Sequence, residues 1–161
     1  MNIAVCSGTF DPVTNGHLDI IKRATSFFDK VIVGVAADNN KNTLFPLEER
    51  LRMVEMTTRD MDKVTAKSFS GLLVDFAQRE GAKAIVRGLR AVSDFEYEFK
   101  MASMNKKLNN EIETVFLMTS SKYSYLSSSV VRQVASLGGC IKGLVPPEIE
   151  KILVERYKGM T

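Results

Sequence analysis

The only histidine of the chain, His17, lies in a segment whose residue types could bind and act on a phosphate group. The segment begins at Ser7 and contains Gly8, which permits a tight turn and a close approach of the backbone to a ligand. It leads from an apolar run into a helical segment, whose first turn offers unpaired N–H groups and a positive dipole end to an anion. Helical side chains lean toward the N-terminus, so we expect His17 to project toward that anion. The alternative is a surface histidine beside a turn.

Two further segments carry residue types that suit phosphate oxygens. Arg87 and Arg90 flank Gly88, and we expect this group to lie in the loop after a strand. A guanidinium is permanently charged, and its fork of donors fits phosphate oxygens. Three serines, at 127–129, open an apolar helical segment and could offer hydroxyl and N–H groups to an anion. Solvated arginines and a simple helix N-cap are the alternatives.

Strand-like and helix-like segments alternate along the whole chain, and these elements must position the candidate loops. β-Branched or aromatic runs predict strands at residues 2–6, 31–37, 64–68, 84–86 and 114–118. Helical spacing predicts helices at 18–28, 51–61, 72–79, 94–108 and 149–157. This alternation predicts an α/β fold, a doubly wound, five-stranded, mainly parallel sheet in a single domain over residues 1–161. Ligands of such sheets bind beyond the carboxyl ends of the strands, where the strand order reverses.

Composition excludes several other classes of protein. A chain of 161 residues, 45% apolar and 25% charged, can fill one globular core. The net charge of +3 is spread along the chain, which argues against a nucleic-acid surface. The longest apolar run is too short to span a membrane, and Cys6 and Cys140 have no metal-ligand spacing. We therefore expect a cytoplasmic protein that binds neither nucleic acid nor membrane.

The candidate loops resemble those of a known enzyme family. Thr14-x-Gly-His17 is similar to the signature of the nucleotidyltransferase superfamily, and Thr9-Phe-Asp-Pro12 before it is similar to the loop of phosphopantetheine adenylyltransferases. The stretch 85–98, Ile-Val-Arg-Gly-Leu-Arg-Ala-Val-Ser-Asp-Phe-Glu-Tyr-Glu, matches a long and specific block of that family. Residues 123–132 resemble the superfamily motif Ile-Ser-Ser-Ser/Thr-x-x-Arg/Lys, with Leu126 in place of isoleucine.

The resemblance extends over nearly the whole chain. The segments Phe45-x-Leu-Glu-Glu-Arg50 and Gly71-Leu-Leu-Val-Asp75 match the same family, and the match ends near Pro147. Ser7 stands where the family usually has proline, Pro46 stands where many members have serine or threonine, and Thr119-Ser-Ser is an uncommon variant. None of these departures removes a side chain expected to contact phosphate.

The resemblance implies a reaction and a set of residue roles. The expected reaction transfers AMP from ATP to 4′-phosphopantetheine, giving dephospho-coenzyme A and pyrophosphate in coenzyme A biosynthesis, with Mg²⁺ held through the ATP phosphates rather than by protein ligands. His17 is implied as the transition-state stabiliser, with Thr9 and Lys41 aligning the acceptor phosphate. Implied acceptor-binding residues are Thr9, Lys41, Leu73 and Arg87. Implied ATP-binding residues are Thr9, Phe10, His17, Gly88, Leu89, Arg90, Glu98, Tyr123, Ser124, Tyr125, Leu126, Ser127, Ser128 and Ser129.

The family resemblance also implies a homohexamer. The helical segment 94–108 is consistent with this, because it carries two apolar stripes: Phe95, Phe99 and Ala102 on one side, and Tyr97, Met101, Met104 and Leu108 on the other. A helix that is apolar on two sides is expected to be buried on both, and one of them could be a subunit contact.

Two other functions compete with this interpretation. A related nucleotidyltransferase could use nicotinamide mononucleotide or glycerol phosphate, but the block at 85–98 is particular to the phosphopantetheine enzymes. A non-catalytic nucleotide sensor could share the α/β architecture, but it has no use for a histidine at the α-phosphate.

Overall fold

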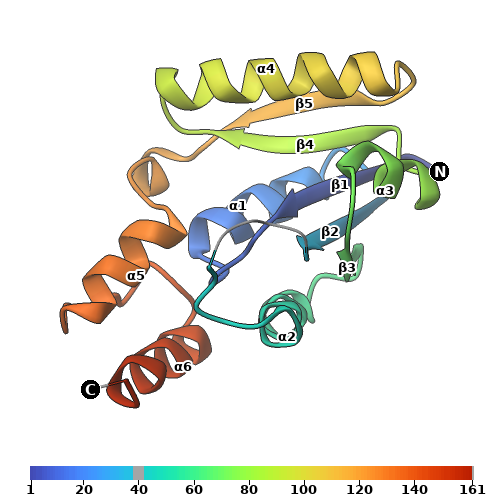
Figure 1. Cartoon of the computed structure of the whole chain (residues 1–161). Helices are drawn as coiled ribbons and strands as arrows, with labels where there is room; N and C mark the ends of the chain where they lie inside the picture. Colours follow the sequence, from blue (N-terminus) through green and yellow to red (C-terminus); the bar gives the residue numbers. More distant parts are fainter. Residues whose placement is uncertain (38–41, 161) are drawn as a thin grey trace.

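A five-stranded parallel sheet forms the centre of the computed structural model, which describes residues 1–37 and 42–160 (Figure 1). Its strands are β1 (Ile3–Gly8), β2 (Lys30–Ala36), β3 (Val64–Phe69), β4 (Ala84–Leu89) and β5 (Glu113–Met118). The strand order is β3-β2-β1-β4-β5, and each neighbouring pair is parallel. The order reverses between β1 and β4, so the predicted doubly wound parallel sheet is confirmed.

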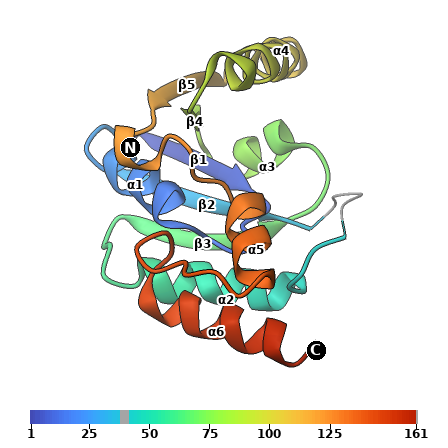
Figure 2. The same ribbon diagram turned by 90° about the vertical axis from the view of Figure 1, so that its left-hand side faces the viewer.

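Helices cover both faces of the sheet. They are α1 (Asn15–Ala24), α2 (Leu47–Thr58), α3 (Leu73–Arg79), α4 (Val92–Leu108), α5 (Ser128–Ser136) and α6 (Pro147–Lys158), with a 3₁₀ turn at Ser121–Tyr123. In Figure 1, α4 lies above β5, α3 lies at the level of β4 and β1, and α2, α5 and α6 lie below or to the left of the strands. Figure 2 shows α6 running along α2, with α5 at the end of the sheet where the strands finish.

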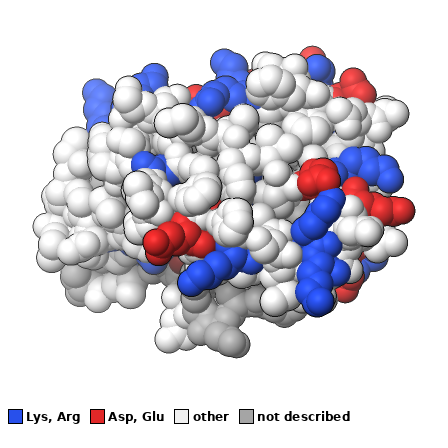
Figure 3. All heavy atoms as spheres, turned by 90° about the horizontal axis from the view of Figure 1, so that it is seen from above, with Lys and Arg blue, Asp and Glu red and all other residues white. Residues whose placement is uncertain are grey.

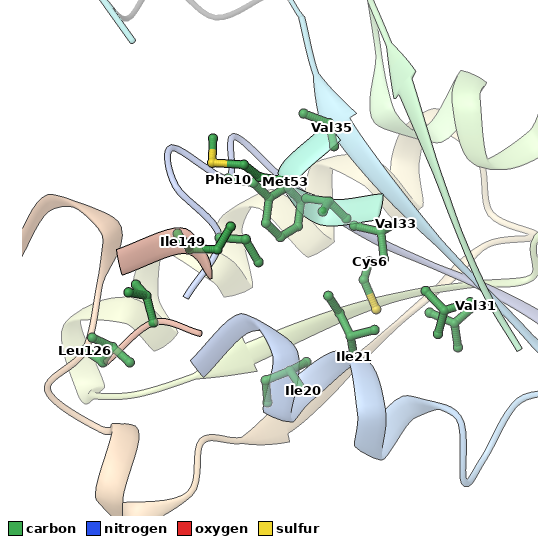
Figure 4. Close-up of a cluster of buried hydrophobic side chains, with 14 of the residues drawn as sticks. Cys6, Phe10, Ile20, Ile21, Val31, Val33, Val35, Met53, Leu126 and Ile149 are labelled. Carbon is green, nitrogen blue, oxygen red and sulfur yellow. The ribbon is translucent and has the colours of Figure 1, made fainter. Parts of the chain in front are cut away.

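Alternating side chains of the central strands fill two hydrophobic cores. Cys6, Val31, Val33 and Val35 point to the face covered by α1, α2, α5 and α6, and they pack there with Ile21, Met53 and Ile149 (Figure 4). Val5, Ile32 and Ile85 point to the other face and pack against Val74, Phe76 and Ala77 of α3. Burial on both faces explains why these strands read as continuous apolar runs, as buried parallel strands do.

Several boundaries differ from the sequence predictions: β1, predicted at residues 2–6, continues to Gly8, and the largest shifts concern β4, α1 and α2. Strand β4 continues through Arg87 to Leu89, paired with β5 throughout, so the expectation that Arg87 lies in a loop is wrong. Arg87 and Gly88 interrupt the run of β-branched residues, but the pairing of β4 with β5 continues through both. Helices α1 and α2 end before Phe28 and Met61. Both of these residues pack on the core from the turns after their helices, and this extended the apparent helical spacing.

Helix α4 turns polar side chains toward the body of the protein and leaves its large apolar side chains exposed. Its partly buried residues include Asp94, Glu98, Ala102 and Asn105, which recur at helical spacing. The large apolar side chains of the helix are all exposed: Val92, Phe95, Tyr97, Phe99, Met101, Met104 and Leu108, of which Tyr97 and Met101 also line cavities beside the helix. In the single chain neither predicted apolar stripe is buried, so that expectation is wrong for the protomer. Figure 3 shows the molecule from above, the side on which α4 lies in Figure 1, and broad uncharged areas separate the charged groups there.

Candidate active site

A cavity of about 560 Å³ lies at the carboxyl ends of β1 and β4, on the side where the strand order reverses. Its lining comes from the loop after β1, the first turns of α1, the end of β4, the start of α4 and the segment that leads into α5. This is the position at which a doubly wound sheet binds its ligands. The loops after β1, β4 and β5, which the sequence singled out, therefore meet at one cavity.

The loop after β1 holds Phe10 in a conformation that few side chains adopt. Phe10 has φ 53°, and for a residue other than glycine such backbone strain costs about 1–3 kcal/mol. Its buried ring lies over Gly8, where an added Cβ would come within 3.2 Å of the ring. The ring also meets the imidazole of His17 edge-on, with centroids 4.9 Å apart. A side chain at position 8 would therefore crowd the ring that lies against His17.

Asp11 fixes the same loop to the segment before α2. Its two carboxylate oxygens accept hydrogen bonds from the backbone N–H groups of Leu44 (2.8 Å) and Phe45 (2.9 Å). The side chain is buried and lies 3.6 Å from the guanidinium of Arg132. Arg132 also donates to the Asp11 carbonyl at 2.6 Å and to Ser129 Oγ at 3.4 Å. The loop after β1 is thereby held from two sides.

His17 is part of a capping box at the start of α1. The Thr14 hydroxyl accepts from the His17 N–H at 3.2 Å, and the Thr14 N–H donates to His17 Nδ1 at 3.0 Å. Because Nδ1 accepts a hydrogen bond, the hydrogen of the neutral ring belongs on Nε2, an assignment made from the hydrogen-bond network. The ring lines the cavity and can offer Nε2–H as a donor to a ligand.

The surroundings of His17 keep its ring neutral. Burial, together with the smaller effect of the positive charges of Arg87 and Arg90, lowers the pKa of His17 from an ordinary 6.5 to about 4. A neutral imidazole beside two guanidinium groups can donate a hydrogen bond without adding a third positive charge. The predicted position of His17, in the first helical turn at an anion site, fits this geometry.

Arg87 lies on β4 and is bound on two sides. Its Nε and Nη2 donate to the two carboxylate oxygens of Glu98, at 3.0 and 2.9 Å, and its Nη1 donates to the Ser7 carbonyl at 2.8 Å. Burial alone lowers the pKa of Arg87, but the hydrogen bonds and charge of Glu98 outweigh this and raise it above its ordinary value. Arg87 is a fixed cation in the wall of the cavity.

Arg90 follows β4 and connects two walls of the cavity. Its Nε donates to Asp94 at 2.8 Å, and its Nη1 donates to the carbonyl of Leu126 at 2.9 Å. Ser127 caps α5 by accepting from the Val130 N–H at 3.2 Å, as the N-cap interpretation predicted. The capped start of α5 faces the cavity, so its N–H groups and Arg90 can serve one anion together.

A small second cavity of about 120 Å³ lies beside the first, on the other side of Arg87 and Glu98. Leu73, Met101 and Ala102 line it, and Arg87, Glu98 and Tyr97 line both cavities. The ion pair therefore forms part of the wall between the main cavity and a smaller, more apolar recess. Leu73, predicted to contact the acceptor, opens onto this recess.

The structure brings most of the sequence-predicted residues to the main cavity. Those in its lining are Thr9, Phe10, His17, Arg87, Gly88, Arg90, Glu98, Tyr123, Leu126, Ser127, Ser128 and Ser129. Leu89, Ser124 and Tyr125 are their chain neighbours but do not belong to that lining. Lys41 lies outside the described residues.

Several lining residues were missed by sequence reasoning. Arg132 lines the cavity and is the arginine that ends the motif at 123–132, so the motif carried the signal. Asp11 lies in the motif 9–12, and Asp94 and Tyr97 lie in the block 85–98, so these motifs also carried a signal. Thr119 lines the cavity as well, but nothing in its local sequence shows that it faces a ligand site.

The acidic groups of the cavity are already engaged by the protein. Asp11 accepts from two backbone amides, Asp94 from Arg90 and Glu98 from Arg87. In the part of the chain that the structure describes, no group of three or more His, Cys, Asp or Glu residues could hold a metal ion. None of the helices at residues 1–37 and 42–160 has the length and apolar character needed to cross a membrane.

This combination of fold and site defines an enzyme class. The parallel sheet, the histidine in the first turn of α1, Arg87 on β4 with Arg90 after it, and the serine-capped helix α5 meet at one switch-point cavity. Together they are the parts of a nucleotidyltransferase. A family model described as cytidylyltransferase-like matches residues 5–134, which includes all of these parts.

The chain belongs to the phosphopantetheine adenylyltransferase family. A relative of that name from Moorella thermoacetica is 71% identical over 157 residues, covering 98% of this chain and 98% of the relative. Another, from Clostridium tetani, is 62% identical and covers 92% of this chain and 93% of the relative. A third, from Geotalea daltonii, is 52% identical over 98% of both.

Two solved structures with the same fold are those of other adenylyltransferases. A putative nicotinate-nucleotide adenylyltransferase from Vibrio parahaemolyticus has a TM-score of 0.73 at 18% identity, covering 98% of this chain and 96% of that one. A bifunctional NMN adenylyltransferase/ADP ribose pyrophosphatase from Francisella tularensis, complexed with AMP and a Mn ion, has a TM-score of 0.71 at 20% identity, covering 99% of this chain and 51% of that one. At these identities the likeness concerns the fold alone.

Proposed function

We propose that the chain transfers the adenylyl group of ATP to 4′-phosphopantetheine, giving dephospho-coenzyme A and pyrophosphate. The observation that carries the proposal is the arrangement of His17: a neutral ring with its Nδ1 bound to Thr14, its Nε2 available as a donor, and two arginines beside it. High identity to relatives named for this reaction supports the choice of acceptor.

The chemistry needs positioning and charge stabilisation more than proton transfer. A phosphate oxygen of the acceptor attacks the α-phosphorus of ATP, a new P–O bond forms, and the bond to the leaving pyrophosphate breaks. The acceptor phosphate is largely ionised near neutral pH, so no general base is required. The His17 Nε2–H would donate to the α-phosphate oxygens, where negative charge develops in the transition state.

The residues of the cavity divide into two groups in this proposal. Thr9, Lys41 and Arg87 would align the phosphate of the acceptor, and Leu73 would contact its tail in the small second cavity. The remaining residues would bind ATP: Arg90, Ser128 and Ser129 on the β- and γ-phosphates, with Phe10, Gly88, Leu89, Glu98 and the segment 123–127 completing the site. Arg132, joined to Ser129, is well placed to add a third cation on the phosphate side.

Mg²⁺ is the metal we propose for the reaction. It would neutralise charge on the ATP phosphates. The lining residues fit a metal that is held by phosphates and water, because each acidic side chain of the cavity already has an arginine or backbone amide partner. The chain's own contribution is to fix the phosphates with Arg90 and the start of α5.

A homohexamer in the cytoplasm completes the proposal. The exposed apolar face of α4 supports an assembly, because an uncovered patch of this composition on a single chain marks an interaction surface. A second copy of the chain would contribute the same exposed apolar side chains of α4 to the contact.

Pyrophosphate release measured with a panel of acceptors tests the proposed activity. The chain is incubated with ATP, Mg²⁺ and one of 4′-phosphopantetheine, nicotinamide mononucleotide or glycerol phosphate. We expect release with 4′-phosphopantetheine to exceed the other two greatly. Equal rates across the panel, or none with 4′-phosphopantetheine, would rule out the assignment, and ATP binding without any release would favour the nucleotide sensor.

A further inference from the structure

Arg50, in the first turn of α2, is a buried arginine whose hydrogen bonds go to the backbone of three separate segments. Only 3% of the residue is exposed. Its Nε donates to the carbonyl of Phe45 at 3.0 Å, and its Nη1 donates to the carbonyls of Thr9 at 2.8 Å and Ala36 at 3.0 Å. In the described part of the chain, no ion pair joins Arg50 to an acidic side chain.

These three carbonyls belong to the loop after β1, the end of β2 and the turn into α2. Side chains in a helix lean toward its N-terminus, so the guanidinium reaches the edge of the sheet where the cavity opens. The fork of donors on an arginine can serve several carbonyls at once from fixed directions. Arg50 therefore joins the first cavity loop to the two elements beside it.

The Thr9 carbonyl is part of the peptide that enters Phe10, the residue with φ 53°. A residue in this conformation persists only where the surrounding structure holds it there. Arg50 binds this peptide from one side, and the Phe10 ring packs over Gly8 and against His17 on the other. A displacement of the Thr9–Phe10 peptide would therefore move both the Thr9 side chain and the surface on which the imidazole rests.

Asp11 acts on the same loop from its other end. Its carboxylate accepts from the Phe45 N–H, while Arg50 donates to the Phe45 carbonyl. Phe45 is fully buried, so this link does not depend on an exposed side chain. Residues 9–11 are thus connected to the start of α2 at both ends.

We propose that Arg50 is a positioning residue for the transfer reaction: by holding the Thr9–Phe10 peptide, it places Thr9 at the acceptor phosphate and the Phe10 ring against His17. The proposal rests on the role proposed above for Thr9. Arg50 contacts neither substrate in this scheme, and it acts through the backbone of the loop. Its charge is not the essential feature, since all three partners are carbonyl groups.

The test compares Arg50→Lys with Arg52→Lys. Lysine keeps the charge but carries all its donors on one atom, so it cannot reproduce the fork. Arg52 lies on the same helix and is exposed, with no hydrogen bond or ion pair to a described residue, which makes it a matched control. We expect Arg50→Lys to lower kcat about 10- to 100-fold and to raise the acceptor KM, since small misplacements of reacting groups have effects of this size. The Kd of ATP, measured by calorimetry, should change less than the acceptor KM, because Phe10 is one of many residues proposed to bind ATP, and Arg52→Lys should behave as wild type.

Three readouts separate positioning from a merely structural role. If Arg50→Lys lowers only the Tm, with wild-type kcat and acceptor KM for the folded enzyme, the proposal is wrong. In a Thr9→Ala background, Arg50→Lys should raise the acceptor KM much less than it does alone, whereas full additivity would contradict action through Thr9.

If the lysine variant does not fold, Arg50→Gln, which removes the charge and keeps an amide donor, is measured instead by the same criteria. A wild-type chain that releases no pyrophosphate with 4′-phosphopantetheine would refute the proposed function, a result distinct from all of these.

Discussion

Glu98, on α4, binds the guanidinium of Arg87, on β4, through two parallel hydrogen bonds of 2.9 and 3.0 Å. The pair is partly buried and lies between the main cavity and the small recess lined by Leu73. Glu98 was predicted to contact ATP and Arg87 to contact the acceptor, but in this structure the two side chains contact each other. Glu98 therefore fixes the direction from which Arg87 can approach an acceptor phosphate.

Replacing Glu98 should loosen Arg87 without removing it. In Glu98→Gln, one oxygen remains as an acceptor but the charge and one of the two strong hydrogen bonds are lost. We expect the acceptor KM to rise about tenfold, which corresponds to about 1.4 kcal/mol. Steady-state kinetics with 4′-phosphopantetheine measures this. Glu96→Gln, an exposed site on the same helix, is the control, and an unchanged acceptor KM in Glu98→Gln would contradict the role of the pair.

Arg90 should affect the other substrate. Its Nη1 is bound to the Leu126 carbonyl, next to the serines that open α5, so it lies on the side proposed for the β- and γ-phosphates. We expect Arg90→Ala to weaken ATP binding about 10- to 100-fold, the loss of one charged hydrogen-bonding partner, while the acceptor KM changes little. Calorimetric titration with ATP and Mg²⁺ gives the first value and kinetics the second. A larger effect on the acceptor than on ATP would show that the two groups are assigned the wrong way round.

The strands and helices could be predicted from the sequence because the pattern of apolar residues within each segment indicates them. Buried parallel strands need apolar side chains on both faces, and Val31, Ile32 and Val33 show this in three consecutive positions. The end of β4 did not follow, because Arg87 and Gly88 are poor strand residues that the ladder with β5 keeps in place. His17 was located by its position after a strand, but the bond from the Thr14 N–H to Nδ1, which sets its tautomer, depends on a rotamer that only the structure shows.

The inward side of α4 illustrates a different limit. Apolar spacing predicted two buried stripes, yet Asp94 and Glu98 face the body of the protein and the large apolar side chains of both stripes are exposed. The carboxylates lie inside because Arg90 and Arg87 bind them there, and these partners come from β4 and the residue that follows it. Hydrophobic periodicity carries no information about such pairs. In the same way, no local pattern shows that Arg50 reaches the carbonyl of Thr9.

The exposed apolar stripe of α4 formed by Tyr97, Met101, Met104 and Leu108 should form a contact between subunits. Met104 lies within this stripe and is exposed. We expect light scattering to show an assembly for the wild-type chain, and Met104→Glu to reduce its mass, because a buried charge without a partner is costly at an interface. Met160→Glu makes the same substitution at an exposed methionine beyond α6 and should leave the assembly intact. A wild-type chain that is monomeric at micromolar concentration would contradict this prediction.

The protonation of His17 can be followed directly, because it is the only histidine of the chain. With a pKa lowered to about 4, the ring should stay neutral as the pH falls from 7 to 5, and its NMR signals should indicate the Nε2–H form. Between pH 6.5 and 4 the unfolded chain binds the proton more readily than the folded one, so His17 should make the free energy of unfolding decrease as the pH falls through this window. A titration midpoint near 6.5 would show that the ring is not held neutral by its surroundings.

Kinetic analysis of His17→Ala tests the central claim most directly. The claim is that Nε2–H donates to charge that develops at the α-phosphate in the transition state, so removing it should spare ATP binding and lower kcat. Loss of one such preorganised donor lowers kcat by ~10²–10³, or about 3–4 kcal/mol in transition-state stabilisation. The variant's fold is checked by circular dichroism, and kcat and both KM values are then compared with those of the wild type. We predict a folded enzyme with near-normal KM for ATP and a kcat reduced at least a hundredfold; a folded His17→Ala with near-wild-type kcat would show that the histidine only caps α1.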